Sequence, residues 1–378
     1  MKMPPQRIAL VALVAVVLVG ALAWWQARTA EPRAQATRAT SALVATTPAV
    51  PSAGKRAPQV PVAAAMAARE QCKSALFGGV IERTRQLAGR DDAASQLAYA
   101  LTADMTGPSP KSEQEISRLM AVKQRAFARA RQLDPAHTDI AWLAAENCLN
   151  GPECAAAQEA ALQAEPDNAA VWLRAMTRAH ARNDDAALEQ AFKRASAAPR
   201  YDSHRGSTVV AVMDGYAGLP MPAACMDTDV QALVREELPG GGPFHASMFI
   251  EKMALGREFM SMTYANALRT LCEAADGGAL PSGRQADCVR VYSAIASGPS
   301  IVEQQMALSQ LVELTADAPE GAVHRERYRQ LQWLTQEKRK HSKLLDHVAM
   351  GASEVETLQT ALAKAGRWPP PANWHPEE

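Results

Sequence analysis

Soft metal ligands gather on one predicted helix, over residues 244–275. Its methionines are Met248, Met253, Met260 and Met262. With His245 just before them, their thioether sulfurs could bind copper(I) in an exported protein, because soft ligands suit that ion. Phe249 and Phe259 are interleaved with the methionines, however, and a methionine-rich core face explains this pattern better. We therefore assign no metal site and no cofactor to this helix.

A second predicted helix, over residues 319–350, carries a run of cations that could meet lipid phosphates or an acidic partner. The run consists of Arg325, Arg327, Arg329, Lys338, Arg339, Lys340 and Lys343. These charges are distributed around the helix, and Glu320, Glu326 and Glu337 offset them at pairing distances. The pattern favours a solvated helix face over a binding site.

No catalytic or metal motif is visible. Glu337 and His341 share a helix face one turn apart, but two ligand types do not make a site and the neighbouring lysines would repel a cation. The stretch 239–243 (PGGGP) lacks the lysine of a phosphate loop and is interpreted as a linker. GxSxG, HExxH and CxxC patterns are absent from the sequence. We name no catalytic residue, and a binding function is favoured over an enzymatic one.

The tail over residues 368–378, WPPPANWHPEE, is rich in proline and tryptophan. Three successive prolines favour an extended polyproline conformation that presents Trp368 and Trp374. The tail could dock on the last helix or serve as a ligand for the groove of a partner. Docking is favoured, because exposed tryptophans are costly for a soluble domain.

Charge and export signals limit the class of partner. Lys and Arg together number 40, as do Asp and Glu, so no net field attracts nucleic acid and no nucleic-acid partner is expected. Ile8 to Trp25 is almost continuously apolar behind Lys2 and Arg7, which is typical of a membrane-insertion signal. We favour a retained anchor, and Ala21-Leu22-Ala23 leaves a cleaved signal peptide as the alternative. Either form exports the chain that follows.

Six cysteines follow this signal, and an even number in an exported chain favours disulfides. Cys148 and Cys154 flank one predicted turn between two helices, and Cys272 and Cys288 flank another such turn. Each of these pairs would join the ends of a helical hairpin. Cys72 and Cys225 would then form a long-range bridge by elimination.

Helix start signals recur along the chain. Capping boxes are expected at Ser112 with Glu115, Thr228 with Gln231, Ser282 with Gln285, Ser300 with Glu303, and Ser353 with Glu356. Alanine is abundant from Ala63 to Ala198, and such small side chains let helices approach closely. No convincing strand pattern appears, so the sequence predicts an all-α fold.

Between Ala126 and Pro199 the helical pattern repeats. The repeating residues are Pro135 and Trp142-Leu143, then Pro166 and Trp172-Leu173, with Phe127 and Ala130 matched by Phe192 and Ala195. This stretch resembles the tetratricopeptide repeat, although Glu146 and Met176 replace the small residue expected four positions after each tryptophan. The resemblance implies stacked antiparallel helical hairpins and a groove for extended peptides. Arg174 and Arg178 are candidate exposed contact residues in that groove.

The predicted organisation is a stacked, tetratricopeptide-like array of antiparallel helical hairpins, with further hairpins in the C-terminal half. Its parts are a signal-anchor or signal peptide (1–26), a disordered Ala/Pro/Thr tether (27–61), a repeat-like domain (62–238), C-terminal hairpins (239–367) and the Pro/Trp tail (368–378).

The function expected is that of a membrane-tethered scaffold or adaptor in the cell envelope, which in a bacterium places its soluble domain in the periplasm. If the signal is cleaved, the protein is secreted. A protein or peptide is the expected partner, and this expectation is based partly on analogy with the repeat family. The alternatives are a helical envelope enzyme with a site assembled from distant residues, and a structural protein that self-associates.

Overall fold

The computed structural model describes most of the chain after Pro61. The described ranges are 62–106, 112–148, 152–235, 244–246, 248–251, 254, 264–273, 278–340 and 353–376. All described residues belong to one unit, Val60–Glu378. The predicted anchor, the tether and the 239–243 linker lie outside the described ranges.

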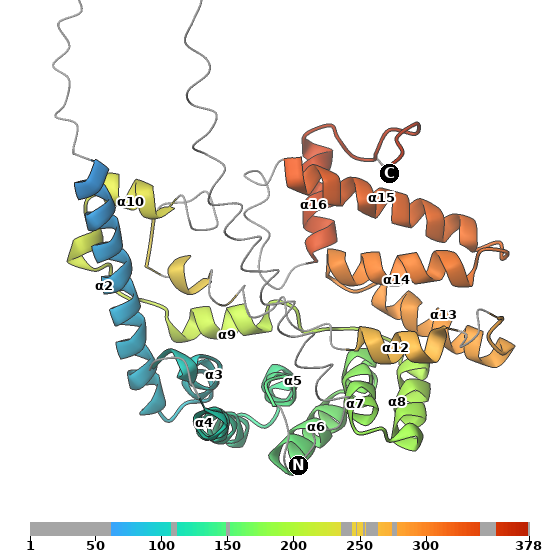
Figure 1. Ribbon diagram of the computed structural model, residues 1–378, viewed down its shortest axis with the longest axis horizontal. Coiled ribbons are helices and arrows are strands. Elements are labelled where there is room, and N and C mark those ends of the chain that lie inside the picture. The colour runs from blue at the N-terminus through green and yellow to red at the C-terminus, as the bar shows by residue number, and fades with distance from the viewer. Residues whose placement is uncertain are drawn as a thin grey trace, which may run out of the picture. The chain divides into compact units, whose positions relative to one another are not determined.

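Helices form the described part of the molecule (Figure 1). In chain order they are α2 (Val62–Ala88), α3 (Ala93–Thr102), α4 (Glu113–Leu133), α5 (Thr138–Glu146), α6 (Pro152–Ala164), α7 (Ala169–Ala181), α8 (Asp185–Ala197), α9 (Ser207–Gly215), α10 (Thr228–Arg235), α12 (Ala265–Cys272), α13 (Ser282–Ile295), α14 (Ile301–Leu314), α15 (Gly321–Lys340) and α16 (Glu354–Lys364). Two short 3-10 helices are η2 (Ala103–Thr106) and η3 (Ala223–Cys225). The described ranges contain no β-strand and one isolated bridge, between Asn168 and Arg200. The predicted all-α fold is confirmed.

Consecutive helices pack against one another, as α3 does with α4, α5 with α6, α7 with α8, and α14 with both α13 and α15. Contacts between distant elements close the structure. Helix α9 returns to α3, α10 packs on α2, and α12 lies against α7 (Figure 1).

Several helices begin with the predicted caps. Ser112 and Glu115 form a complete capping box, and the Ser300 and Ser353 hydroxyls accept hydrogen bonds from the backbone N–H groups of Glu303 and Glu356. Two predicted boxes are wrong. At α13 the N-cap residue is Pro281, which has no side-chain cap. At α10 the cap is the carboxylate of Asp227, one residue before Thr228, which accepts hydrogen bonds from the backbone N–H groups of Asp229 and Val230.

The predicted helix over 244–275 is also wrong in extent. Phe244 to Ala246 are not helical, whereas residues 248–251 and 254 are, and Tyr264 forms a turn before α12 begins at Ala265. Met248 is buried, as the core interpretation of the methionines requires, while Met253, Met260 and Met262 lie outside the described ranges.

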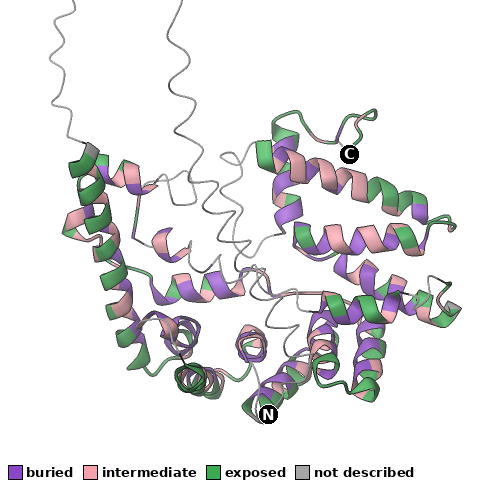
Figure 2. Ribbon diagram, in the orientation of Figure 1, coloured by how far each residue is buried: buried purple, intermediate pink, exposed green. Residues whose placement is uncertain are grey.

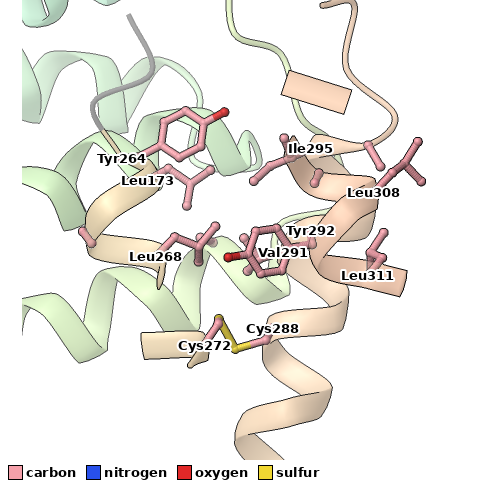
Figure 3. Packing of buried hydrophobic residues seen from close by; sticks show 14 of the residues in the cluster. Leu173, Tyr264, Leu268, Cys272, Cys288, Val291, Tyr292, Ile295, Leu308 and Leu311 are labelled. Carbon is pink, nitrogen blue, oxygen red and sulfur yellow. A yellow bond between two sulfur atoms is a disulfide. The ribbon is translucent and has the colours of Figure 1, made fainter. Parts of the chain in front are cut away.

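Figure 2 marks the buried residues along each helix, and their hydrophobic side chains form three clusters. The first lies among α2 to α7 and α9, and the second among α7, α8 and α12 to α16. Figure 3 shows Leu173 of α7 and Leu268 of α12 packed near Val291 and Ile295 of α13. A smaller cluster joins α2 to η3 and α10. Because the second cluster includes α7 and α8, the core does not divide at the 238/239 boundary suggested by the sequence.

Three disulfides link these elements, and they join the three pairs that the sequence predicts. Cys72 of α2 is bonded to Cys225 of η3 across 153 residues. The bond between Cys148 and Cys154 closes the short turn into α6. Cys272 of α12 is bonded to Cys288 of α13 at the edge of the second core cluster (Figure 3).

Candidate functional site

The connection between α8 and α9, residues 198–206, gathers polar side chains in the middle of the helices. Its main chain is fixed beside the start of α7, because the N–H of Ala169 donates to the Arg200 carbonyl at 2.8 Å. The side chain of Asn168 bonds both the N–H and the carbonyl of Asp202, each at 2.9 Å. These bonds satisfy backbone groups that would otherwise be buried without partners.

His204 is the most tightly held residue of the α8–α9 connection. Its Nδ1 lies 2.5 Å from a carboxylate oxygen of Asp139, its Nε2 bonds Glu165, and Trp142 stacks on the ring at a centroid distance of 4.9 Å. Its backbone φ of 50° lies in the left-handed region, which is uncommon for residues other than glycine. These contacts hold the ring between α5 and the end of α6.

The charges of this cluster stabilise one another. Burial alone would lower the pKa of His204, but the hydrogen bonds to Asp139 and Glu165 outweigh it and raise the pKa to about 9. Burial would raise the pKa of Glu165, yet the bonds from His204 and Arg200 lower it to about 2. At neutral pH the imidazolium therefore lies between two carboxylates, and neither ring nitrogen has a lone pair available for general-base catalysis.

Glu303, at the start of α14, forms a second buried cluster with the same connection. Its carboxylate accepts hydrogen bonds from the hydroxyls of Tyr201 at 2.6 Å, Ser203 at 3.0 Å and Tyr264 at 3.3 Å. Burial raises the pKa of Glu303 above its ordinary value, although the three hydroxyls favour its charged form. Because its partners come from the connection and from the residue before α12, Glu303 joins three elements at one point.

Glu354 continues this arrangement at the start of α16. Its carboxylate bonds Arg205 at 3.0 Å, the N–H of Ile301 at 3.2 Å, and Lys338. The Arg205 guanidinium also donates to the Ser300 hydroxyl at 2.7 Å. The three acidic groups Glu165, Glu303 and Glu354 thus anchor the α8–α9 connection to helices on both sides. Their partners are other protein groups, so these clusters fix the structure and provide no nucleophile and base in a reactive pair.

A cleft of about 600 Å³ opens beside the connection. Its walls come from residues 200–205, the turn between α13 and α14, and helices α14, α15 and α16. Leu308, Leu331 and Leu334 line its apolar part. Gly298 lies in the wall against the Tyr201 ring, where an added Cβ would come within 2.7 Å of a ring carbon, so the close approach requires glycine there. Clefts of this size accommodate small molecules and short peptides.

Three polar side chains of the cleft differ from the clusters beside it. Arg327 on α15 donates to the Ala296 carbonyl at 2.9 Å, and no carboxylate in the described ranges pairs with it. Glu356 has no ion-pair partner among the described residues, and the amide of Gln359 makes no hydrogen bond there. The cleft is therefore a place in the described structure where a cation, an anion and an amide lie near one another and can contact a ligand.

A smaller cavity of about 310 Å³ lies between α3, α5 and α9. Asp92, Asp134, Asp139 and Asp214 line it together with apolar side chains. Asp92 caps α3 and Asp139 bonds His204, so two of these carboxylates already serve the fold. Among the residues that the structure describes, no group of three His, Cys, Asp or Glu side chains could hold a metal ion.

Arg174 and Arg178 are not the exposed contact residues that the sequence suggested. Arg174 donates to the carbonyls of Ala145 and Glu146, and Arg178 donates to the carbonyls of Ala145 and Cys154. Burial lowers the pKa of Arg174 to about 10, which leaves it charged at neutral pH. Both guanidiniums donate to the Ala145 carbonyl at the end of α5, where the last carbonyls of a helix lack partners within it, and Arg178 also donates to the Cys154 carbonyl at the start of α6.

The basic helix and the tail form contacts within the protein. Glu337, considered above as a metal ligand beside His341, is buried and pairs with Arg367 at 3.1 Å, and His341 lies outside the described ranges. The Arg329 guanidinium donates to the carbonyls of Pro371 and Trp374, each at 3.1 Å. The tail therefore docks within the protein, as the sequence favoured, but on α15 and not on the last helix, α16. Trp374 meets Trp333 of α15 edge to face at 5.1 Å.

Sequence reasoning missed His204, Glu303 and the cleft side chains. A signal was present, because the connection reads RYDSHRGS, an unusually polar stretch for the centre of a helical chain. Arg327 was noted only as part of the cation run.

The described helices include none long and apolar enough to cross a membrane. Comparisons of the chain with protein-family models, curated proteins and solved structures give no match. The resemblance to the tetratricopeptide repeat therefore depends on the residues of 126–199 alone, and the stacking of hairpins in that family's manner is not confirmed.

Proposed function

We propose that this protein is a membrane-tethered scaffold or adaptor of the cell envelope whose exported helical domain binds a protein or peptide partner. The observation that carries this proposal is the cleft beside the α8–α9 connection. Around the cleft, buried carboxylates form hydrogen bonds and ion pairs with hydroxyl groups and cations of the protein, whereas the side chains of Arg327, Glu356 and Gln359 can still contact a ligand. A surface with unmatched polar groups around apolar side chains suits recognition more than bond cleavage.

Export is supported by the apolar segment from Ile8 to Trp25 and by the state of the cysteines. All six cysteines are in disulfides, and such bonds persist in oxidising compartments. A retained anchor and a flexible tether would hold the binding domain near the membrane while allowing it to move laterally.

The location is tested with reporters fused after Glu378. We expect alkaline phosphatase, which needs an oxidising compartment, to be active, and a fluorescent protein that matures only in the cytoplasm to remain dark. The opposite pair of results would refute export. N-terminal sequencing of the mature protein separates an anchor from a cleaved signal.

Binding is tested by site-specific photocrosslinking in intact cells. A photoreactive amino acid at position 359 places the label in the cleft, and the same label at Thr360 provides a matched control on an exposed position of the same helix. We expect a discrete crosslinked protein from position 359 and not from position 360. Equal labelling at both positions, or none at either, would contradict a partner in the cleft.

A further inference from the structure

We infer that the cleft recognises a short stretch of peptide that carries one anionic and one cationic group. The inference rests on the proposed function, which makes the cleft a binding site, and adds the chemistry of the ligand that binds there. The charges in the cleft wall are the first evidence. Arg327 is contributed by α15 and Glu356 by α16, so the two unpaired charges have opposite signs and come from different helices.

The other charges of the wall are already compensated. Arg200 pairs with Glu165 and Asp167, and Arg205 pairs with Glu354. A ligand with a single strong negative charge, such as a phosphate, would meet the guanidinium of Arg327 but would also face the carboxylates of Glu356 and Asp202. Only a ligand with charges of both signs matches both unpaired groups.

Amide groups supply the second line of evidence. Gln304 donates to the Gly298 carbonyl and Gln330 donates to Glu326, and each uses its NH₂ group in that bond. Their carbonyl oxygens therefore remain as acceptors, and Gln359 offers both an acceptor and donors. A peptide presents N–H and C=O groups in alternation, which complements such a set of amides.

The apolar and aromatic side chains of the cleft narrow the choice of ligand further. Leu308, Leu331, Leu334 and Val355 give the cleft an apolar part that can receive small side chains of a peptide. Tyr201 is the only aromatic residue among the described cleft residues, and its hydroxyl is held by Glu303. A sugar would be expected to stack on open aromatic faces, so a peptide fits this wall better than an oligosaccharide.

Two sources could supply this chemistry, a segment within a partner protein or a free oligopeptide with charged termini. The test uses isothermal titration calorimetry on the full chain in detergent. One set of synthetic peptides has blocked termini and contains one aspartate and one lysine, in both orders, separated by one, two or three alanines. A second set consists of unblocked di-, tri- and tetra-alanine, whose only charges are the terminal ammonium and carboxylate groups.

We expect at least one peptide to bind, and binding of the blocked set identifies a protein segment as the source. Binding of the unblocked set alone identifies a free oligopeptide. Arg327→Gln and Glu356→Gln should each weaken binding about five- to tenfold, as expected for a partly exposed charged hydrogen bond. Arg325→Gln, which removes a cation from the same helix outside the cleft, should leave affinity unchanged.

The sharpest control exchanges the charges. In the double variant R327E/E356R, we expect the preferred order of aspartate and lysine in the blocked peptides to reverse. If no peptide of either set binds at millimolar concentration, or if Arg325→Gln weakens binding as much as Arg327→Gln, the inference is overturned. These results are independent of the crosslinking experiment, because a free oligopeptide can bind when no partner protein is captured.

Discussion

Replacing His204 by glutamine tests the central cluster, because its two carboxylate partners would face each other without the imidazolium. The pKa of His204 rises from 6.5 to about 9 on folding, and each pKa unit corresponds to about 1.4 kcal/mol. The charged ring thus contributes about 3 kcal/mol to the free energy of unfolding. Loss of one partner from a buried ion pair costs about 3–5 kcal/mol, and since Glu165 keeps Arg200, we expect a value near the lower end.

The pH dependence has a definite sign. A group whose pKa is raised by folding stabilises the folded state fully below its unfolded pKa, so the contribution of His204 is complete below about pH 6.5. This contribution decreases as the pH rises above 6.5, and it is lost as the pH passes the folded-state pKa of about 9. The difference in stability between the wild type and His204→Gln should therefore be largest near pH 6 and smallest near pH 9.5.

Urea unfolding followed by circular dichroism, repeated at several pH values between 5.5 and 9.5, measures this difference. His180→Gln is the matched control, because His180 is an exposed residue of α7 and its loss should change stability by less than about 0.5 kcal/mol. A loss at His204 below about 1 kcal/mol near pH 6, or one that stays constant across this pH range, would refute the assignment of a buried imidazolium.

Three further perturbations follow from the contacts. Removing the long-range disulfide as the double variant C72S/C225S should cost about 5 kcal/mol by the loop-entropy relation for 153 residues, and a change below about 2 kcal/mol in thermal or urea unfolding would contradict it. Arg329→Gln should release the tail over 368–376, so acrylamide should quench tryptophan fluorescence more strongly than in the wild type; unchanged quenching would show that the tail docks without this guanidinium. Trp172→Ala should lower the free energy of unfolding in urea by about 2–3 kcal/mol, through lost packing and loss of the hydrogen bond from the ring N–H to the Pro166 carbonyl. The loss is smaller than for a fully buried tryptophan because the ring is half-buried, and a value below about 1 kcal/mol would mean that the ring contributes little packing.

The sequence predicted features that are encoded locally. The capping box of Ser112 and Glu115 lies within four residues, and a turn flanked by two cysteines identifies a hairpin bridge. The polar clusters follow no such local rule. His204 is 65 residues from Asp139, and Tyr201 is 102 residues from Glu303. Nothing in the helical period relates positions at such separations, so only the three-dimensional structure brings them together.

Glu303 shows how a local rule can describe one part of a residue and miss the other. The capping-box pattern correctly placed its backbone N–H on the Ser300 hydroxyl. Its carboxylate, which that pattern would direct back to the N-cap, is instead taken by three hydroxyl groups from other elements. Arg174 is a similar case, since its position on α7 cannot reveal that the carbonyl end of α5 lies beside it. Burial and tertiary contacts overrode the local preference in both residues.

The bond between Cys72 and Cys225 also determines how the domain would respond to mechanical force. A pull transmitted along the chain into α2 reaches Cys72 and passes directly through the sulfur atoms to residue 225. Helices α3 to α9 lie within the covalent loop that this bond closes, so tension between the two ends of the chain does not extend them. Only the start of α2 and the elements after η3 carry the load. The α5 wall of the His204 cluster is thereby shielded from stretching, whereas α14, α15 and α16, which form much of the cleft, remain in the mechanical path.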